Sequence, residues 1–471
     1  MESADVRSQW ESAGQTKLFR FFDSLSTAQQ KHLLDQLSVL DPMQLKKLAA
    51  EYVTQKPAIT LPKQINPVKA YPREPRADQV KLYADAKKRG NELVSSGKVA
   101  AFLVAGGQGT RLGYNGPKGE YPVTPINQKP LFQVFAEQIR AWSRDTGKQV
   151  PWYIMTSDAN DTATREFFGK HNFFGLPKAD VFFFQQGMMP AFGLDGQLLL
   201  GAKDSLALSP DGHGGSLRAL ERSGAVADMR KRGVEHLSYF QVDNPLIHII
   251  DPLFIGLHDL SGSEMSSKTI SKATALEKVG NFVDADGIVQ VIEYSDLPDE
   301  LAKQTNSDGS LRFNEGSIAI HALRLSFIER LNGSGTLSLP WHRADKKVPY
   351  VDDTGNEVKP EKPNAVKLEQ FVFDAIPLAK NAIVYTTDRA EEFSPVKNAE
   401  GVDSPATCRR DQVRRAARWL TQAGVKVPML QGEPNATLEI SPLVATSAEQ
   451  LAKRKLGFDA LDSGAKLSLD A

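Results

Sequence analysis

The chain has 471 residues, of which 41% are hydrophobic, so it can build a sizeable core divided among about two to four domains. Its 57 basic and 57 acidic residues cancel, which gives no global electrostatic reason to expect nucleic acid or an anionic membrane as a partner. The single cysteine excludes an intramolecular disulfide, and no apolar run approaches the ~20 residues that span a bilayer, so we expect a cytoplasmic protein.

Residues 1–95 are predicted to form a helical N-terminal region with a proline-rich strap. Ser26 and Gln29 have the spacing of a capping box, and Asp41 followed by proline is typical of a second helix start. Five prolines in residues 57–75 fix φ and remove backbone donors, so this stretch is predicted to run extended. A further helix is expected to end near residue 95.

Residues 96–400 alternate between short apolar runs and helical patterns. Strands are predicted at 99–105, 152–156, 181–184, 236–242, 287–294 and 317–321, and helices at 130–143, 162–171 and 217–223. This alternation predicts an α/β domain with a mostly parallel sheet covered by helices on both faces. Ligands bind such sheets where strands end at their carboxyl side. Residues 401–471 are predicted to form a small C-terminal domain.

A glycine-rich loop follows the first strand of this domain. Residues 105–113 are Ala-Gly-Gly-Gln-Gly-Thr-Arg-Leu-Gly, and Pro-Lys-Gly follows at 117–119. Missing side chains let backbone N–H groups approach phosphate oxygens, while Arg111 offers a planar fork and Lys118 a point charge. The nucleotide-binding candidates in this loop are Ala105, Gly106 and Gly107.

Two familiar phosphate-binding loops do not match this segment. A Walker A loop needs Gly-Lys followed by Ser or Thr, whereas Lys118 lies between proline and glycine. A dinucleotide-binding loop opens a helix at once, but Pro117, Pro122 and Pro125 disfavour a long helix here. The loop is therefore predicted to run on and carry Arg111 and Lys118 over a bound nucleotide.

These residues resemble the signature of the nucleotide-sugar pyrophosphorylases. More narrowly, they are similar to the eukaryotic-type UDP-sugar pyrophosphorylase family, closest to its UDP-N-acetylhexosamine pyrophosphorylase branch, over residues 95–405. The resemblance implies a Rossmann-like, glycosyltransferase-A-like nucleotidyltransferase domain: a mixed sheet flanked by helices, with a helical N-terminal region and a small C-terminal domain. It also implies UTP, a sugar-1-phosphate, a UDP-sugar and pyrophosphate as substrates and products, and a monomer or weak oligomer.

Two further motifs fit the recognition of a uracil base. Gln186 follows a predicted strand, its amide can both donate to and accept from a base edge, and the resemblance implies that it reads uracil. Gly212 and His213 precede a predicted helix, where glycines allow a planar base to approach closely. The family usually has Asn at position 213, and a neutral imidazole nitrogen cannot both donate and accept, so the detail of base recognition stays open.

Asp243 ends a predicted strand and is the candidate metal ligand, since Mg²⁺ prefers carboxylate and phosphate oxygens. The resemblance implies Mg²⁺, with Mn²⁺ as a substitute. It also assigns the sugar to Gly280, Glu293 and Ser317. The family members that use N-acetylhexosamines have Asn where Ser317 stands, and serine has a shorter reach.

Two lysines complete the predicted site. Lys367 and Lys397 each lie in a motif that matches the family, and the resemblance places both over the phosphates. The implied reaction is attack of the sugar-1-phosphate oxygen on the α-phosphorus of UTP. Because a phosphate monoester is already largely anionic near pH 7, no general base is required, and positioning with charge neutralisation by Arg111, Lys118, Lys367 and Lys397 would carry the catalysis.

Three alternatives stay open at this point. N-acetylglucosamine-1-phosphate leads as the sugar, but Ser317 keeps glucose-1-phosphate and galactose-1-phosphate in play. A non-catalytic nucleotide-sugar sensor would keep Gln186 and the glycines but lose the charges that this chain retains. A dinucleotide oxidoreductase would need a helix starting at Gly109 and would bind NAD.

Overall fold

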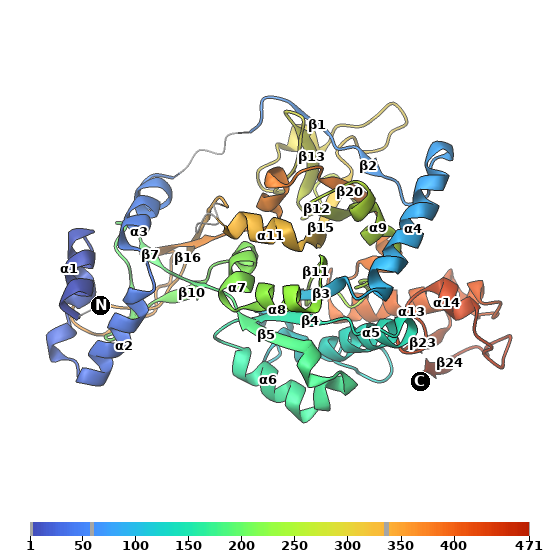
Figure 1. Cartoon of the computed structure of the whole chain (residues 1–471), viewed down its shortest axis with the longest axis horizontal. Coiled ribbons are helices and arrows are strands. Elements are labelled where there is room, and N and C mark those ends of the chain that lie inside the picture. The colour runs from blue at the N-terminus through green and yellow to red at the C-terminus, as the bar shows by residue number, and fades with distance from the viewer. Residues whose placement is uncertain (1–2, 57–60, 334–338, 471) are drawn as a thin grey trace. The chain divides into compact units, whose positions relative to one another are not determined.

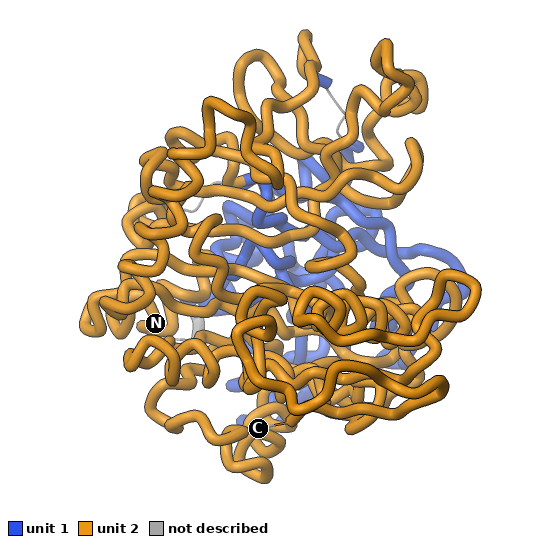
Figure 2. Tube along the Cα trace, turned by 90° about the vertical axis from the view of Figure 1, so that its right-hand side faces the viewer, with its two compact units in different colours: residues 1–61, 186–216, 338–374 blue, residues 62–185, 217–337, 375–471 orange. Residues whose placement is uncertain are grey.

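The structure is a computed structural model that describes residues 3–56, 61–333 and 339–470. The chain folds into two compact units, shown in blue and orange in Figure 2. Unit 1 comprises residues 1–61, 186–216 and 338–374, and unit 2 comprises residues 62–185, 217–337 and 375–471. Each unit therefore combines stretches that are far apart in the sequence. The three domains predicted from the sequence stay a prediction.

A mixed sheet, 11-stranded among the described residues, forms the centre of unit 2 (Figure 1). Its main path runs in the order β2 (Ala70–Tyr71), β20 (Ile383–Thr386), β12 (Met265–Ser271), β15 (Glu315–Arg324), β11 (His236–Gln241), β3 (Val99–Val104), β4 (Trp152–Thr156) and β5 (Val181–Gln185). Strands β11, β3, β4 and β5 are parallel neighbours, whereas β15 runs antiparallel to both β11 and β12. The α/β class and the mixed sheet are therefore confirmed.

Helices cover both faces of this sheet, as the apolar strand sequences predict. Strand β3 is apolar throughout because a central parallel strand is buried on both sides. Leu103 packs on one face with α5 (Leu131–Thr146) and α6 (Asp161–Lys170). On the other face, the hydroxyl of Tyr153 donates to Asp228 of α8 (Ala225–Arg232) at 2.7 Å.

Helices α4 (Val80–Ser95) and α9 (Pro252–Leu260) cross in unusually close contact. A Cβ atom on Gly90 would overlap the carbonyl of Pro252, and one on Gly256 would overlap the carbonyl of Ala86. Both glycines are therefore required by packing. The Asp251 side chain caps α9 by accepting from the Leu253 N–H at 3.0 Å, which fixes the start of this helix.

The proline-rich strap adds edge strands to the sheet of unit 2. Its residues 57–60 lie outside the described residues. The described part is extended, as predicted: β1 (Ile65–Pro67) pairs with β13 (Asn281–Ala285), and β2 pairs in parallel with β20. Strand β13 also forms a hairpin with β14 (Ile288–Ile292).

The N-terminal helices belong to unit 1. They are α1 (Ser3–Ser12), α2 (Thr27–Ser38) and α3 (Pro42–Leu48). The predicted capping box is confirmed, since Ser26 and Gln29 bond each other reciprocally, and Asp41 caps α3 as expected. Leu33 and Leu37 share a core with Phe192 and Val366, so these helices pack on strands contributed by two much later segments.

Small sheets make up the rest of unit 1. Their strands are β6 (Met188–Pro190), β7 (Phe192–Gly193), β8 (Leu200–Ala202), β9 (Ser205–Leu206), β10 (Leu208–Pro210), β16 (His342–Lys346), β17 (Tyr350–Val351), β18 (Glu357–Val358) and β19 (Ala365–Glu369). Strand β19 pairs with both β16 and β7, and β6 pairs with β10.

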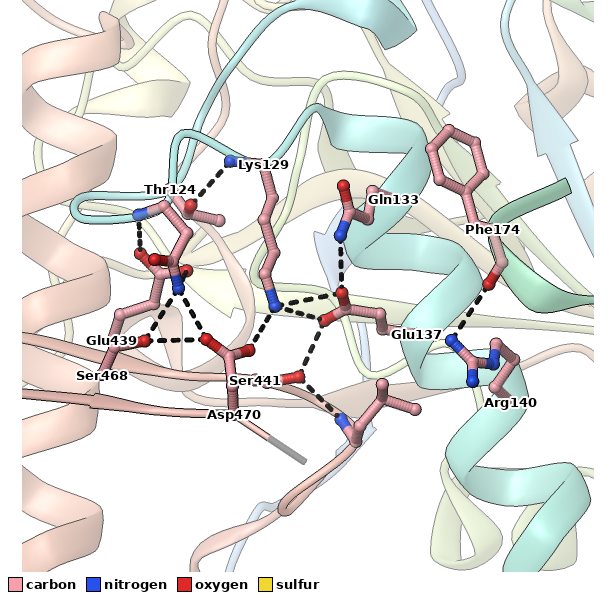
Figure 3. Close-up of polar contacts among 12 residues, drawn as sticks. Thr124, Lys129, Gln133, Glu137, Arg140, Phe174, Glu439, Ser441, Ser468 and Asp470 are labelled. Carbon is pink, nitrogen blue, oxygen red and sulfur yellow. Dashed lines mark hydrogen bonds and ion pairs between the residues drawn. The ribbon is translucent and has the colours of Figure 1, made fainter. Parts of the chain in front are cut away.

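The C-terminal segment of unit 2 holds the loop that precedes α5 (Figure 3). Glu439 accepts from the backbone N–H groups of Ile126 and Asn127 at 2.7 and 2.9 Å. Lys129 bonds Glu137 at 3.0 Å and Asp470 at 2.5 Å. This polar cluster therefore fixes the chain shortly after Lys118. The elements of this segment are α13 (Pro405–Gln422), β21 (Met429–Leu430), β22 (Glu433–Pro434), β23 (Ala436–Ile440), α14 (Ala448–Ala452) and β24 (Ala465–Leu469).

The remaining helices are short. They are α7 (Ser216–Arg222), α10 (Asp299–Ala302), α11 (Leu325–Asn332) and α12 (Arg389–Glu392). In the described part of the chain, every helix falls short of the length and apolar character that crossing a bilayer requires.

Candidate active site

The glycine-rich loop leaves β3 at its carboxyl end, where the sequence predicts a ligand. Two residues that follow β4 bond the carbonyls of this loop: Asn160 donates to Ala105 O at 2.9 Å, and Ser157 donates to Gly106 O at 2.8 Å. Within the described ranges, the N–H groups of Gly106 and Gly107 have no protein acceptor. A Cβ at Gly107 would meet no protein atom within 4 Å, so packing does not require glycine here, and a ligand could approach the backbone closely.

The loop does not open a long helix, as the prolines predict. Two short 3-10 turns cover Thr110–Leu112 and Lys118–Glu120. The N–H of Lys118 donates to Gly107 O at 3.1 Å, which closes the loop and returns Lys118 to the glycines. A long helix first begins at Leu131. The geometry therefore differs from a dinucleotide-binding turn.

Four of the predicted charged residues come together in unit 2. The half-buried Lys118 interacts electrostatically with Asp243, Arg111 and Lys397. Burial lowers the pKa of Lys118, repulsion from Arg111 and Lys397 lowers it further, and attraction to Asp243 opposes both effects. Three cations around one carboxylate suit a polyanionic ligand, because bound phosphates would relieve their mutual repulsion.

Backbone hydrogen bonds hold the motifs of Asp243 and Lys397 side by side. The N–H of Val396, next to Lys397, donates to Asp243 O at 2.8 Å. The Asn244 side chain donates to Glu392 O at 2.6 Å. The two motifs are about 150 residues apart in the chain, yet these bonds hold them together.

Asp243 is half-buried at the carboxyl end of β11 and is a suitable magnesium ligand. Groups of three or more His, Cys, Asp or Glu side chains that could cage a metal ion do not occur among the described residues. Mg²⁺ at nucleotide sites commonly takes one or two carboxylates and completes its shell with phosphates and water. Asp243, which lies near the cations Lys118, Arg111 and Lys397, fits this kind of site.

The three predicted sugar-binding residues also converge in unit 2. The Ser317 N–H donates to Gly280 O at 2.8 Å. A Cβ at Gly280 would lie 3.6 Å from both Glu293 Oε1 and Ser317 Cβ, and 2.6 Å from Val291. Gly280 directly precedes β13, Glu293 directly follows β14 and Ser317 lies on β15, so pairing of the strands, not sequence proximity, brings them together.

The predicted uracil-reading residues lie in unit 1 and are neighbours there. Gly187, next to Gln186, accepts at its carbonyl from the Asp211 N–H at 3.1 Å. Gly212 has φ of +88°, and a Cβ there would overlap the Gln370 backbone, so only glycine fits. Gln186 precedes β6 and Gly212 follows β10, and these two strand ends are adjacent because β6 and β10 pair antiparallel.

His213 packs inside unit 1 more than its loop position suggests. Its ring stacks on Phe371 with centroids 5.1 Å apart, and its Nδ1 accepts from the Val372 N–H at 3.0 Å. Burial lowers the pKa of His213 to about 4, so the ring is neutral near pH 7. Only Nε2–H then remains available, which makes His213 a donor toward any ligand.

Lys367 lies on β19 of unit 1, half-buried. Burial lowers its pKa, repulsion from Lys346 adds to this, and Glu369 opposes it. The structure therefore groups Lys367 with Gln186, Gly212 and His213 in one unit, and the other predicted site residues in the second.

Sequence reasoning missed several residues that shape the site. Asn160 holds the glycine loop after β4, and its position at the end of the next parallel strand could have indicated this role. Asp403 pairs with Lys397 at 3.8 Å, and its carbonyl accepts from the Lys397 N–H at 2.7 Å. No pattern in the sequence marks this contact, because it depends on how the 397–403 loop closes.

A glycine loop at a strand end, with three cations and a carboxylate beside it, defines a nucleotide-dependent transferase. Residues 43–403 match the sequence family described as UTP–glucose-1-phosphate uridylyltransferase. The chain is 40% identical to the human UDP-N-acetylhexosamine pyrophosphorylase-like protein 1, over 95% of this chain and 94% of that protein. It is 36% identical to the UDP-N-acetylglucosamine pyrophosphorylase of Saccharomyces cerevisiae, over 96% and 97% of the two chains.

A solved structure agrees with these sequence relatives. The uridine diphosphate N-acetylglucosamine pyrophosphorylase of Trypanosoma brucei has a TM-score of 0.82 and 26% identity, covering 96% of this chain and 95% of that one. The chain belongs to the UTP–glucose-1-phosphate uridylyltransferase family. It is a nucleotidyltransferase, and the family resemblance inferred from the motifs is confirmed.

Proposed function

We propose that this chain transfers the uridylyl group of UTP to N-acetylglucosamine-1-phosphate, giving UDP-N-acetylglucosamine and pyrophosphate. The cluster of Lys118, Arg111, Lys397 and Asp243 beside the glycine loop carries the proposal, because it suits a transferred phosphoryl group. The named relatives of yeast and Trypanosoma brucei support the choice of sugar.

In the proposed reaction, the phosphate oxygen of the sugar-1-phosphate attacks the α-phosphorus of UTP. The new O–P bond forms as the bond from the α-phosphorus to the bridging oxygen of pyrophosphate breaks, in line. Negative charge therefore grows on the leaving pyrophosphate. Arg111 and Lys118 are the groups proposed to neutralise it, and Lys397 and Lys367 to hold the reacting phosphates.

The proposed binding roles follow the local geometry. The free N–H groups of Gly106 and Gly107 would receive the nucleotide, and Gln186 with the Gly212 backbone and His213 would read the uracil. Gly280, Glu293 and Ser317 would hold the sugar. Asp243 would bind Mg²⁺, which when present supplies further charge neutralisation at the phosphates.

A non-catalytic sensor is disfavoured by the cost of the charge cluster. Arg111, Lys118 and Lys397 repel one another around Lys118, and burial adds to the cost of keeping Lys118 charged. A protein that only recognised a nucleotide sugar would gain stability by losing some of these charges. Their retention favours catalysis.

One panel of substrates tests the proposal. The protein is incubated with UTP, magnesium and, separately, the 1-phosphates of N-acetylglucosamine, N-acetylgalactosamine, glucose and galactose, and pyrophosphate release is measured. We expect the highest kcat/KM with N-acetylglucosamine-1-phosphate. Highest kcat/KM with glucose-1-phosphate or galactose-1-phosphate would overturn the choice of sugar, and no release with any sugar-1-phosphate would overturn the reaction itself.

A further inference from the structure

Lys268 is a fully buried cation that the proposed reaction does not use. It lies on β12 with 1% of its side chain exposed. Its Nζ atom is 2.6 Å from Asp251 Oδ2 and 2.6 and 2.8 Å from the two carboxylate oxygens of Glu392. The same Nζ lies 5.3 Å from the ring centroid of Phe254. Lys268 therefore joins the centre of the sheet to two other segments.

One of these segments leads directly to the proposed site. Glu392 begins the stretch that ends at Lys397, and its carbonyl accepts from the Asn244 side chain at 2.6 Å. Asn244 Oδ1 in turn accepts from the Ser394 N–H at 3.2 Å. Together with the bond from Val396 to Asp243, these contacts attach the stretch carrying Lys397 to the strand end carrying Asp243.

The other segment is rigid. Asp251 uses one carboxylate oxygen to cap α9 and the other to accept from Lys268. Helix α9 is locked against α4 by the contacts of Gly90 and Gly256, which leave no room for a Cβ atom. Lys268 thus ties Glu392 to a helix whose place is already fixed.

Arg415 of α13 joins the same two active-site segments from the outside. Its guanidinium donates to Leu246 O at 2.8 Å and to Glu391 O at 3.0 Å. The cations of Lys268 and Arg415 thus both act on Glu392, which His248 also approaches at 3.2 Å.

Stability alone does not account for such a network. Well-packed apolar side chains of similar volume are often as stable as a buried ion pair, or more so. The Lys268 ammonium is instead shared by two buried carboxylates, Asp251 and Glu392, so its removal leaves them without the cation that holds them together. The residue attached here, Glu392, lies five positions before Lys397, whose Nζ is 5.5 Å from the ring centroid of Phe393.

We propose that Lys268 is a positioning residue: by holding Glu392 against Asp251, it sets where Lys397 stands relative to Asp243. The inference rests on the roles proposed above for these two residues. Lys268 touches neither substrate nor metal in this account. Its effect is on catalysis through geometry, so it is expected to alter kcat and the response to magnesium more than the binding of the sugar.

The test compares two substitutions that each remove a cation bonded to an end of α9. Lys268→Met removes the cation at the N-terminal end. Arg324→Met is the matched control. Arg324 bonds Asp259 at 3.0 Å, at the C-terminal end of the same helix, and pairs with His236 at the start of β11, the end of that strand away from Asp243. Melting temperatures are measured for both, and kinetics are run well below them.

We expect Lys268→Met to lower kcat about 10²-fold, the scale of an ~1 Å misplacement of a reacting group. The magnesium concentration for half-maximal rate rises, while KM for N-acetylglucosamine-1-phosphate stays unchanged. Arg324→Met lowers the melting temperature but keeps the wild-type kcat. Equal kcat values for the two variants would show that Lys268 is merely structural and would overturn the inference.

A second variant decides the matter if Lys268→Met does not fold. Glu392→Gln keeps the size of the side chain and leaves Lys268 paired with Asp251. It is expected to lower kcat about tenfold through a looser Lys397 segment. A wild-type kcat in Glu392→Gln would overturn the inference.

Binding measurements separate this inference from the proposed function. If the wild-type protein releases no pyrophosphate with any sugar-1-phosphate, the proposed function fails, and calorimetric titration with UTP and magnesium chloride decides the inference. A Kd weakened by Lys268→Met or Glu392→Gln but not by Arg324→Met supports it. Equal Kd values in wild type and all variants overturn it.

Discussion

Lys118 carries the most direct prediction about the reaction. Lys118→Met removes its charge and keeps most of the side-chain length. If Lys118 neutralises the departing pyrophosphate, its contribution grows as the transition state forms. The substitution is therefore expected to lower kcat about 10²–10³-fold, which corresponds to ~2.7–4 kcal/mol of barrier.

The surroundings of Lys118 predict the opposite effect on stability. Burial lowers the pKa of Lys118, and the charges of Arg111 and Lys397 lower it further against the pull of Asp243. A lysine whose folded-state pKa is lowered costs stability while it is protonated, and this cost is present in full below the folded-state pKa. At pH 7 Lys118→Met removes that cost, so its melting temperature is expected to equal or exceed that of the wild type.

The pH dependence of kcat/KM for UTP follows from the same shift in the ligand-free protein. The charged form of Lys118 is the active one, so kcat/KM falls as pH rises through a pKa that lies below the ordinary lysine value of 10.5. In Lys118→Met this alkaline decline is expected to be absent. In Lys118→Arg the charge persists and the decline moves to higher pH.

The assay is pyrophosphate release from UTP and N-acetylglucosamine-1-phosphate, with thermal melting of each variant. Lys98→Met is the control, because Lys98 precedes the opposite end of β3 and pairs with Glu235 at 2.8 Å. The control is expected to keep wild-type kcat. If Lys118→Met melts normally and turns over as fast as Lys98→Met, Lys118 does not stabilise the transition state.

Three further predictions concern the nucleotide, the sugar and the fold. Gly107→Ala adds a methyl group that meets no protein atom within 4 Å, so the unfolding free energy should change by no more than about 0.5 kcal/mol. KM for UTP is expected to rise at least tenfold, and an unchanged KM would show that Gly107 is not part of the nucleotide site. Ser317→Asn introduces beside Gly280 and Glu293 the amide that the family resemblance implies for enzymes that use N-acetylhexosamines. The ratio of kcat/KM for N-acetylglucosamine-1-phosphate over glucose-1-phosphate should rise, and a constant ratio would show that Ser317 does not govern the choice of sugar. Glu439→Ala leaves the N–H groups of Ile126 and Asn127 without their carboxylate (Figure 3), and denaturant unfolding should show a loss of about 2–4 kcal/mol. Glu433→Ala, which removes an exposed ion pair with Arg414, should leave the unfolding free energy almost unchanged.

Local rules in the sequence predicted the longer elements around the central sheet. Strand β4 was expected at the residues where it forms, and the capping box of Ser26 and the cap of Asp41 are both present. Such signals act within one turn or one strand, so they can be read from neighbouring residues. The antiparallel β15 inside the parallel sheet was not predicted from periodicity, because a strand carries no local mark of its partners' direction.

The sequence by itself determined the chemistry of the site: a glycine loop at a strand end, with Arg111 and Lys118 beyond it and Asp243 at another strand end. Only the tertiary structure decided how these groups meet. Gly280 converges with Ser317, Lys118 interacts electrostatically with Asp243 and Lys397, and Lys268 bonds Glu392; in each case the residues are far apart in the chain. Strand pairing and helix packing set such contacts, and these depend on the whole fold, whereas residue type and strand position are fixed locally.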